Sequence, residues 1–304
     1  MLHLTLRQLR VFEAVARHLN FSRAAEELHL SQPAVSMQIK HLEENVALPL
    51  FEQIGKRIYL TDAGQELFQY SRSIAQQLQE MEAVLDQMKG LERGKLNIAV
   101  VSTANYFAPQ LLARFCQQHD QVTVSLNVSN REEVLRLLAD NATDLAIMGQ
   151  PPEGLDIVAD SFMENPLIVI APLSHPLAKQ RKIPLAKLQH ETFLLREAGS
   201  GTRSAMERFF AEHRIQLKGG MEMGTNEAIK QAVQAGMGLG IISLHTIELE
   251  LETKRLKVLD VEDFPIKRHW YVVHRSQKRL TKVAQAFKGF LLKEAPKLMR
   301  KARA

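Results

Sequence analysis

The sequence holds a single cysteine, Cys116, among its 304 residues. One thiol excludes a disulfide framework within the chain and also excludes a zinc site built from cysteines. The eleven histidines show no metal-binding spacing of the H-E-x-x-H kind. We therefore expect no metal and no cofactor, and the cysteine usage favours a reducing, cytoplasmic location.

Long hydrophobic runs are also missing. The most apolar stretches, "PLIVIAPL" and "GLGIISL", have the length of a β-strand, whereas a membrane helix needs about 20 apolar residues. The N-terminus places Arg7, Arg10, Glu13 and Arg17 among its apolar residues, which predicts an amphipathic helix rather than a signal peptide. We expect no membrane partner, and the length predicts two or three compact units.

The first sixty residues lack a surplus of either charge, with seven basic and six acidic side chains. The net charge of +5 arises elsewhere, because residues 266–304 hold twelve lysines and arginines and one acid, Glu294. The remaining residues carry 27 basic and 33 acidic side chains, a balance of −6. Bulk basicity therefore does not mark the N-terminal part as a nucleic-acid binder, and such a function must rest on where particular side chains lie.

Three helix patterns follow one another in the N-terminal part. Residues 5–17 repeat apolar side chains at steps of three and four. In "FSRAAEELHL", Ser22 is the expected N-cap, and two adjacent alanines allow another helix to approach closely. After a break at residues 29–30, Ser31 is the next N-cap and Pro33 falls in the first turn. Two short helices joined by a tight turn indicate a helix-turn-helix.

The second helix of this motif, in "SQPAVSMQIKHLEE", has an apolar stripe and an opposite face that carries Gln32, Ser36 and Lys40. In a helix-turn-helix the N-terminal part of this helix enters the DNA major groove. A glutamine amide there can pair with adenine through two hydrogen bonds. We predict that Gln32 and Ser36 read bases and that Lys40 contacts a phosphate or a guanine. The alternative is an ordinary solvated face.

The next segment, "PLFEQIGKRIYLTDAG", contains two strand-like stretches with Gly55, Lys56 and Arg57 between them. This pattern predicts a β-hairpin wing with two cations at its tip. Lys56 and Arg57 are expected to contact phosphates, although a hairpin tip is solvated by default.

Residues 6–64, "LRQLRVFEAVARHLNFSRAAEELHLSQPAVSMQIKHLEENVALPLFEQIGKRIYLTDAG", resemble the winged helix-turn-helix of LysR-type transcriptional regulators. The resemblance implies double-stranded promoter DNA as a partner. Met37 departs from the pattern because many relatives carry arginine there, and a methionine can instead touch a thymine methyl group. The residues expected to contact DNA are Ser22, Arg23, Ser31, Gln32, Pro33, Ser36, Met37, Lys40, Lys56 and Arg57.

A long connecting helix is predicted after the wing. Positions 67, 71, 74, 78, 81, 85 and 88 alternate steps of four and three, and six of these seven residues are apolar. A sustained repeat of 3.5 residues favours a seam between two helices, whereas the alternative is packing on the helix's own domain. A dimer would present two recognition helices to a palindromic site. The expected dimerisation residues are Leu67, Ile74, Leu78, Met81 and Leu85.

From Lys95 onwards strand patterns alternate with helix patterns, which predicts mainly parallel sheets covered by helices. Ligands of such sheets bind beyond the carboxyl ends of the strands. Hydroxyl and amide side chains gather there, and the loop "EAGSGTR" leads into a helix N-terminus that favours anions. The alternative is that each residue only caps its helix. The residues expected to bind a small-molecule effector are Ser102, Thr103, Asn130, Gln150, Ser200, Thr202, Arg203 and Asn226.

Two short stretches resemble enzyme motifs but do not match them. "GMGLG" at 236–240 follows a helix and precedes a strand, which is the reverse of the order in a dinucleotide loop. "GSG" at 199–201 is not the G-x-S-x-G elbow of hydrolases. We expect no catalytic residues and no enzyme activity.

The layout of the last two hundred residues resembles the two-subdomain effector domain of LysR-type regulators, which is similar to periplasmic binding proteins. The stretches "TANYFAPQLLARF", "MGQPPEGL", "FMENPLIVIAP" and "REAGSGTRSAMERFF" resemble the subgroup that controls RuBisCO and CO2-fixation operons. That resemblance implies a phosphorylated metabolite or a nucleotide as effector. Arg196, Arg203 or Arg131 would meet its phosphate, unless these arginines only form surface salt bridges.

The expected fold is α/β, with a winged helix-turn-helix at 4–61, a dimerisation helix at 62–90 and an effector domain at 91–304. Subdomain I is expected at about 95–165 and 266–304, and subdomain II at about 166–265. The expected function is that of a DNA-binding regulator that forms homodimers or homotetramers and responds to an anionic metabolite, with RNA polymerase as a further partner. The alternative is a solute-binding or enzymatic α/β protein that does not bind DNA.

Overall fold

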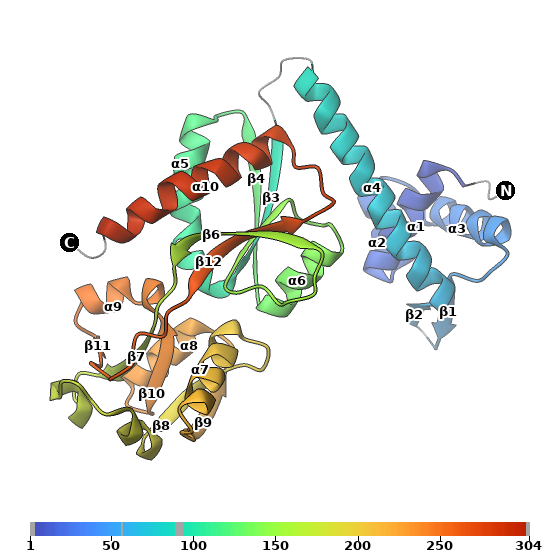
Figure 1. Ribbon diagram of the computed structural model, residues 1–304. Helices are drawn as coiled ribbons and strands as arrows, with labels where there is room; N and C mark the ends of the chain where they lie inside the picture. The colour runs from blue at the N-terminus through green and yellow to red at the C-terminus, as the bar shows by residue number, and fades with distance from the viewer. Residues whose placement is uncertain (1–3, 56, 89–93, 302–304) are drawn as a thin grey trace. The chain divides into compact units, whose positions relative to one another are not determined.

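The computed structural model describes residues 4–55, 57–88 and 94–301. The chain divides into two compact units, Met1–Lys89 and Gly90–Ala304, and each is described by itself (Figure 1). Within the described ranges, no helix combines the length and the apolar character that crossing a bilayer requires.

The first unit is a helical bundle followed by a β-hairpin and a long helix (Figure 1). Its buried centre joins Phe12 and Val15 of the first helix to the two adjacent alanines of the second and to Val35 of the third. The elements are α1 (Leu6–His18), α2 (Phe21–Leu28), α3 (Gln32–Val46), β1 (Phe51–Ile54), β2 (Arg57–Leu60) and α4 (Asp62–Met88).

The start of α2 differs from the sequence-based expectation. Asn20, and not Ser22, is the N-cap, because the Asn20 side chain accepts a hydrogen bond of 3.0 Å from the backbone N–H of Arg23. Asn20 has an extended backbone, as an N-cap requires, whereas Ser22 already lies inside the first turn. Ser31 caps α3 as expected, through a bond from the N–H of Ala34.

The predicted seam of α4 has two different parts. Leu67 packs partly against the core of its own unit, as the alternative for this helix predicts, and Ser71 is buried. One turn further, Ile74 and Leu78 line a groove between α4 and α1. Two turns beyond that, Met81 and Leu85 are 51% and 47% exposed. The outer half of α4 therefore presents an apolar stripe to solvent within one chain.

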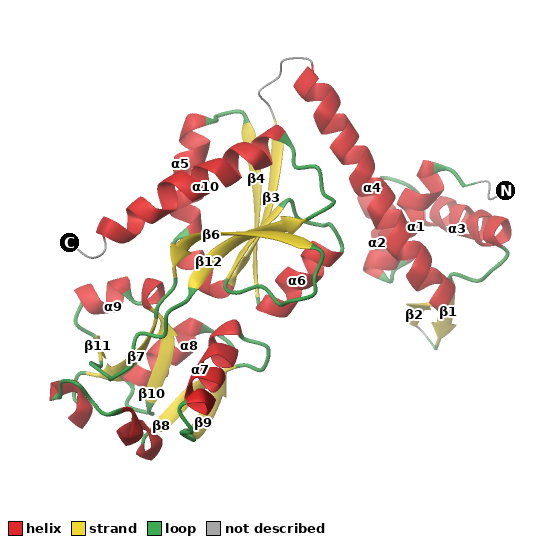
Figure 2. Ribbon diagram, viewed as in Figure 1, coloured by secondary structure: helices red, strands yellow, loops and turns green. Residues whose placement is uncertain are grey.

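The second unit contains two five-stranded sheets, which we call the cores of subdomains I and II (Figure 2). In subdomain I, α5 and α10 pack on one face of the sheet and α6 on the other. The strand order there is β4-β3-β5-β12-β6. Its elements are β3 (Gly94–Val101), η1 (Ser102–Tyr106), α5 (Ala108–Gln118), β4 (Val122–Ser129), α6 (Arg131–Ala139), β5 (Leu145–Met148), β6 (Ile157–Glu164), β12 (His269–Arg275) and α10 (Lys282–Lys301).

Subdomain II has the strand order β11-β7-β10-β8-β9. The helix α7 packs on one face of this sheet and α8 on the other. Its elements are β7 (Leu167–Pro172), η2 (Pro176–Lys179), η3 (Leu185–His190), β8 (Thr192–Arg196), α7 (Gly201–Glu212), β9 (Lys218–Met223), α8 (Asn226–Gln234), β10 (Leu239–Ser243), η4 (Leu244–Thr246), α9 (Glu248–Glu252) and β11 (Leu256–Val258).

The sheets are mixed rather than mainly parallel, which corrects the sequence-based expectation. β3 pairs in parallel with β4 and β5, and β8 pairs in parallel with β9 and β10. In contrast, β12 runs antiparallel to β5 and β6, and β7 runs antiparallel to β10 and β11. The antiparallel strands β7 and β12 each follow a crossing of the chain between subdomains, where no helical connection sets the strand direction.

The chain crosses between the subdomains twice, and the two crossing segments pair with each other. Leu167 and Ile266 exchange two backbone hydrogen bonds of 3.0 Å, and the N–H of Asn165 donates to the carbonyl of Arg268 at 2.7 Å. The two subdomains are therefore joined by a narrow two-stranded neck, which is the kind of connection that permits hinge motion.

Candidate functional site

The exposed face of α3 carries the side chains predicted to read DNA. Gln32, Pro33, Met37 and Lys40 are exposed, whereas the apolar stripe that begins with Val35 is buried. The Gln32 Nε2 donates to the Ser36 Oγ at 2.9 Å, which holds the amide along the helix surface. This face offers donors, acceptors and one methionine, and so has the chemistry that reads base edges.

Other side chains predicted to contact DNA lie on the hairpin and on α2. Gly55 adopts a φ of +64° at the turn between β1 and β2, a conformation that favours glycine. Arg57 is exposed at the start of β2, opposite Ile54. Ser22 and Arg23 are exposed in the first turn of α2. Lys56 lies outside the described residues.

A small polar cavity of about 30 Å³ lies between the two subdomains of the second unit, and we call it the inner pocket. Five residues predicted to bind the effector line it together, from the ends of β3, β4 and β8 and from the start of α7. These five are Ser102, Thr103, Asn130, Ser200 and Thr202. The remaining lining residues are Val101, Arg131, Gly149, Asn165, Arg196, Glu197, Gly201, Arg268 and Trp270.

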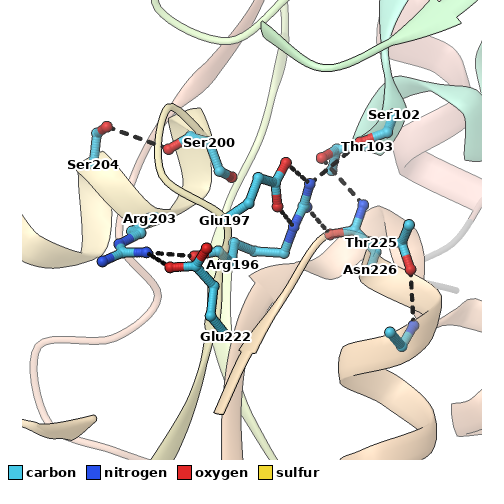
Figure 3. Close-up of polar contacts among 11 residues, drawn as sticks. Ser102, Thr103, Arg196, Glu197, Ser200, Arg203, Ser204, Glu222, Thr225 and Asn226 are labelled. Carbon is cyan, nitrogen blue, oxygen red and sulfur yellow. Dashed lines mark hydrogen bonds and ion pairs between the residues drawn. The ribbon is translucent and has the colours of Figure 1, made fainter. Parts of the chain in front are cut away.

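Arg196 joins the two sides of the inner pocket (Figure 3). Its guanidinium is buried and holds the Glu197 carboxylate through two hydrogen bonds of 2.6 and 2.8 Å. It also donates to the Asn226 Oδ1 at 2.5 Å and to the Ser102 Oγ at 3.4 Å. The Asn226 Nδ2 in turn donates to the Thr103 Oγ1 at 3.2 Å. Two side chains of subdomain II therefore bind two hydroxyls of subdomain I.

Two further lining residues carry buried polar atoms that have no hydrogen-bond partner among the described residues. These atoms are the Trp270 Nε1 and the Asn165 Oδ1, a donor and an acceptor. A buried polar atom without a partner costs about 1–3 kcal/mol, a cost that a polar molecule reaching it would offset. The inner pocket is therefore suited to a small polar molecule.

Three predicted effector residues do not line the inner pocket: Arg203, Gln150 and Asn226. Arg203 sits on the far side of Arg196 from Thr103 (Figure 3), where its guanidinium binds Glu207 at 2.8 Å and Glu222 at 2.5 Å. These two carboxylates raise the pKa of Arg203. We therefore reassign Arg203 to a surface salt bridge. Gln150 lines a neighbouring cavity instead.

Asn130 caps a helix and also lines the inner pocket, whereas Asn226 contacts residues that line the pocket. The Asn130 Oδ1 accepts from the N–H of Glu133 and so caps α6 while the residue lines the inner pocket. Asn226 is buried and reaches the site only through Arg196 and Thr103.

The sequence did not indicate Asn165, Arg268 and Trp270, which the two crossings bring into the pocket wall. A Cβ at Gly149 would overlap the Arg268 guanidinium, so a larger residue there would displace the end of this side chain. In the described part of the chain, no group of three histidine, cysteine or acidic side chains is arranged as a metal site.

Two family descriptions match the chain. Residues 6–65 match "Bacterial regulatory helix-turn-helix protein, lysR family", and residues 89–296 match "LysR substrate binding domain". The chain is 58% identical to the RuBisCO operon transcriptional regulator of Allochromatium vinosum, over 98% of both proteins. It is 47% identical to the HTH-type transcriptional activator CmpR of Synechocystis, over 94% of both proteins.

Solved structures agree with this fold. The regulatory domain of CcmR from Synechocystis, in complex with 2-PG, is 42% identical and has a TM-score of 0.65. It is covered completely and spans 67% of this chain. Full-length CbnR in complex with its target DNA has a TM-score of 0.70 at 22% identity, with 95% of this chain and 99% of that chain covered. The likeness to CbnR shows the fold alone.

Proposed function

We propose that this chain, which belongs to the LysR family of bacterial transcriptional regulators, controls CO2-fixation genes in response to a phosphorylated metabolite. The target genes follow from the names of relatives that share 58% and 47% of their residues with it. The effector class follows from 2-PG (2-phosphoglycolate), the ligand of the related CcmR domain.

The observation that carries this proposal is the inner pocket. Hydroxyls at the end of β3 lie across the pocket from Ser200 and Thr202 of the other subdomain. A ligand that contacts both sides binds the closed arrangement of the subdomains better than an open one. That difference in affinity is what allows a ligand to shift the form that binds DNA.

The assembly would be a homodimer or homotetramer, with the outer half of α4 as one subunit contact. We also propose contact with RNA polymerase, because the related CmpR is named a transcriptional activator. The site of action would be the cytoplasm, where the chromosome lies.

The readout by α3 is tested with Gln32→Ala. We expect a loss of about 1–3 kcal/mol in binding to the operator and little change on random DNA, because one base contact made by two hydrogen bonds is lost. Arg57→Ala is the matched control, since loss of a phosphate contact weakens binding to all sequences and lowers the salt slope by about one. Both variants are measured by fluorescence anisotropy across salt concentrations. Equal losses for Gln32→Ala on both duplexes would contradict its assignment to a base.

The effector site is tested with Thr202→Val. Thr202 is buried in the first turn of α7, and valine keeps its shape while removing the hydroxyl. We expect the effector response to weaken by roughly 1–2 kcal/mol for one lost buried hydrogen bond, with effector-free operator affinity unchanged. The measurement is operator binding during a titration with 2-PG.

Thr225→Val is the control for this experiment. The Thr225 hydroxyl caps α8 by accepting from the N–H of Ala228, and Thr225 is exposed outside the inner pocket. This variant should lower stability by about 1 kcal/mol and leave the response intact. A full response in a normally folded Thr202→Val protein would show that Thr202 serves only to start α7.

A further inference from the structure

A second, larger cavity of about 750 Å³ adjoins the inner pocket, and we call it the outer cavity. Arg131, Gly201 and Arg268 line both. The outer cavity adds a third arginine, Arg208, together with polar and charged neighbours. These neighbours are Gln150, Glu153, Ser204, Glu212, Lys267 and His269.

The three arginines, Arg131, Arg208 and Arg268, form a cluster without a bound carboxylate. In the described ranges no acidic side chain lies within ion-pair distance of any of them, although Glu153 and Glu212 also line the cavity. Arg131 donates only to the carbonyl of Gln150 at 3.0 Å, and Arg268 only to the carbonyl of Gly201 at 3.1 Å. Backbone carbonyls do not neutralise a guanidinium charge.

The three charges repel one another. Burial, and after it the nearby charges of Arg131 and Arg208, lower the pKa of Arg268 to about 10. Burial and then Arg208 also lower the pKa of Arg131. A half-buried cationic cluster of this kind destabilises the protein until an anion joins it.

Other arginines of this unit show the contrast. Arg196, Arg203 and Arg136 each bind a glutamate at 2.8 Å or less. Their charges are compensated within the chain, as expected for residues with a structural role. The arginine cluster is not compensated in this way.

The cluster also spans both subdomains. Arg131 is the first residue of α6 in subdomain I, Arg208 lies on α7 in subdomain II, and Arg268 directly precedes β12 at the neck. Gly201, in the wall of the cavity, is the first residue of α7, so the N-termini of two helices lie at the cluster. Guanidinium groups and helix N-termini both favour oxyanions.

We propose that Arg131, Arg208 and Arg268 form a binding site for a phosphoryl group that adjoins the hydroxyl-lined inner pocket, and that its occupation draws the two subdomains together. This deepens the proposed function and rests on it for the regulatory consequence. The phosphoryl group belongs either to an effector whose other end enters the inner pocket or to free phosphate, and the chemistry of recognition is the same.

The test uses the full chain and calorimetric titration with inorganic phosphate and, separately, with 2-PG. Arg208→Gln removes the exposed member of the cluster and should weaken binding of phosphate about 10-fold, because one charge-assisted contact is lost. Arg136→Gln is the matched control, since Arg136 is exposed on α6 and already bound to Glu133. It should leave the affinity unchanged.

A second measurement separates ligand binding from a structural role. In phosphate-free buffer Arg208→Gln should leave the urea midpoint unchanged or raise it, because a repulsive charge is removed. If Arg208 had only a structural role, its replacement would lower the urea midpoint. If phosphate competes with 2-PG, the site takes the phosphate of the effector, and if both bind at once it takes free phosphate.

The outcomes distinguish this proposal from the proposed function. If the wild type and Arg208→Gln bind phosphate with equal affinity, and 2-PG shifts operator binding equally in both, the arginine site is refuted. The proposed class of effector then stands. Should 2-PG have no effect while Arg208→Gln still weakens phosphate binding, the site stands and the proposed effector class is wrong. Failure of the wild type to bind either anion overturns the site.

Discussion

Replacing Leu78 and Leu85 together by glutamate is expected to convert the protein to monomers and to lower its operator affinity by about 10²–10⁴-fold. Two carboxylates would be buried against the symmetry-related helix without partners. In a dimer, binding of one recognition helix raises the effective concentration of the other at the second half-site. A monomer loses this gain, so its affinity for the operator falls strongly. Sedimentation velocity measures the assembly, and anisotropy measures the affinity.

Leu85 is 47% exposed, so a glutamate at this position should leave the fold of one chain intact and affect only the subunit contact. Leu85→Glu alone should therefore give a folded protein with a weakened dimer, which guards against damage at the half-buried Leu78. Gln77→Glu, an exposed change on the same helix, is the control for added charge. An unchanged sedimentation coefficient in the double variant would refute α4 as the seam.

The second large effect is expected at Arg196. Arg196→Met should destabilise the second unit by about 3 kcal/mol and abolish the effector response. The substitution leaves Glu197 without its counter-ion and the buried Asn226 Oδ1 without its donor. We take the lower end of the range for a broken buried pair because the Glu197 side chain keeps 21% exposure. Urea unfolding followed by Trp270 fluorescence measures the loss, since the chain has a single tryptophan.

Arg203→Met is a closely matched control. Arg203 also binds two glutamates, but their side chains are 56% and 55% exposed. Solvent screens such pairs, so the loss should stay below about 1 kcal/mol, and the response should persist. If both arginines gave the same small loss, the network around Arg196 would not hold the subdomains together.

Local patterns predicted most of the fold. The helix-turn-helix, the hairpin and the alternation of strands and helices follow from apolar periodicity and turn residues, which act over short stretches. Serine and asparagine are both favourable N-caps, so residue type alone does not separate Ser22 from Asn20, and the extended backbone of Asn20 selects it. The mixed sheets were not predicted, since β6 and β12 pair across more than a hundred residues of sequence.

The site was predictable where it is built from strand ends. Ser102, Thr103, Ser200 and Thr202 each follow a strand or start a helix, and the sheet topology brings such positions together. Arg268 carries no such signal because it comes from the neck between the subdomains, and Trp270 carries none because it lies inside β12 rather than at a strand end. Arg203 matched the expected pattern, but Glu222 on the neighbouring strand β9 binds it away from the pocket.

The place of β12 in the sheet of subdomain I has a consequence for synthesis on the ribosome. β6 lies at the sheet edge and pairs only with β12, so residues 157–164 have no partner strand until residues 269–275 have been made. At about 5–20 residues per second that interval lasts roughly 5–20 s. Meanwhile α1 to α4 are complete. Chaperones that recognise unpaired strands should therefore bind the nascent chain mainly between the emergence of β6 and that of β12.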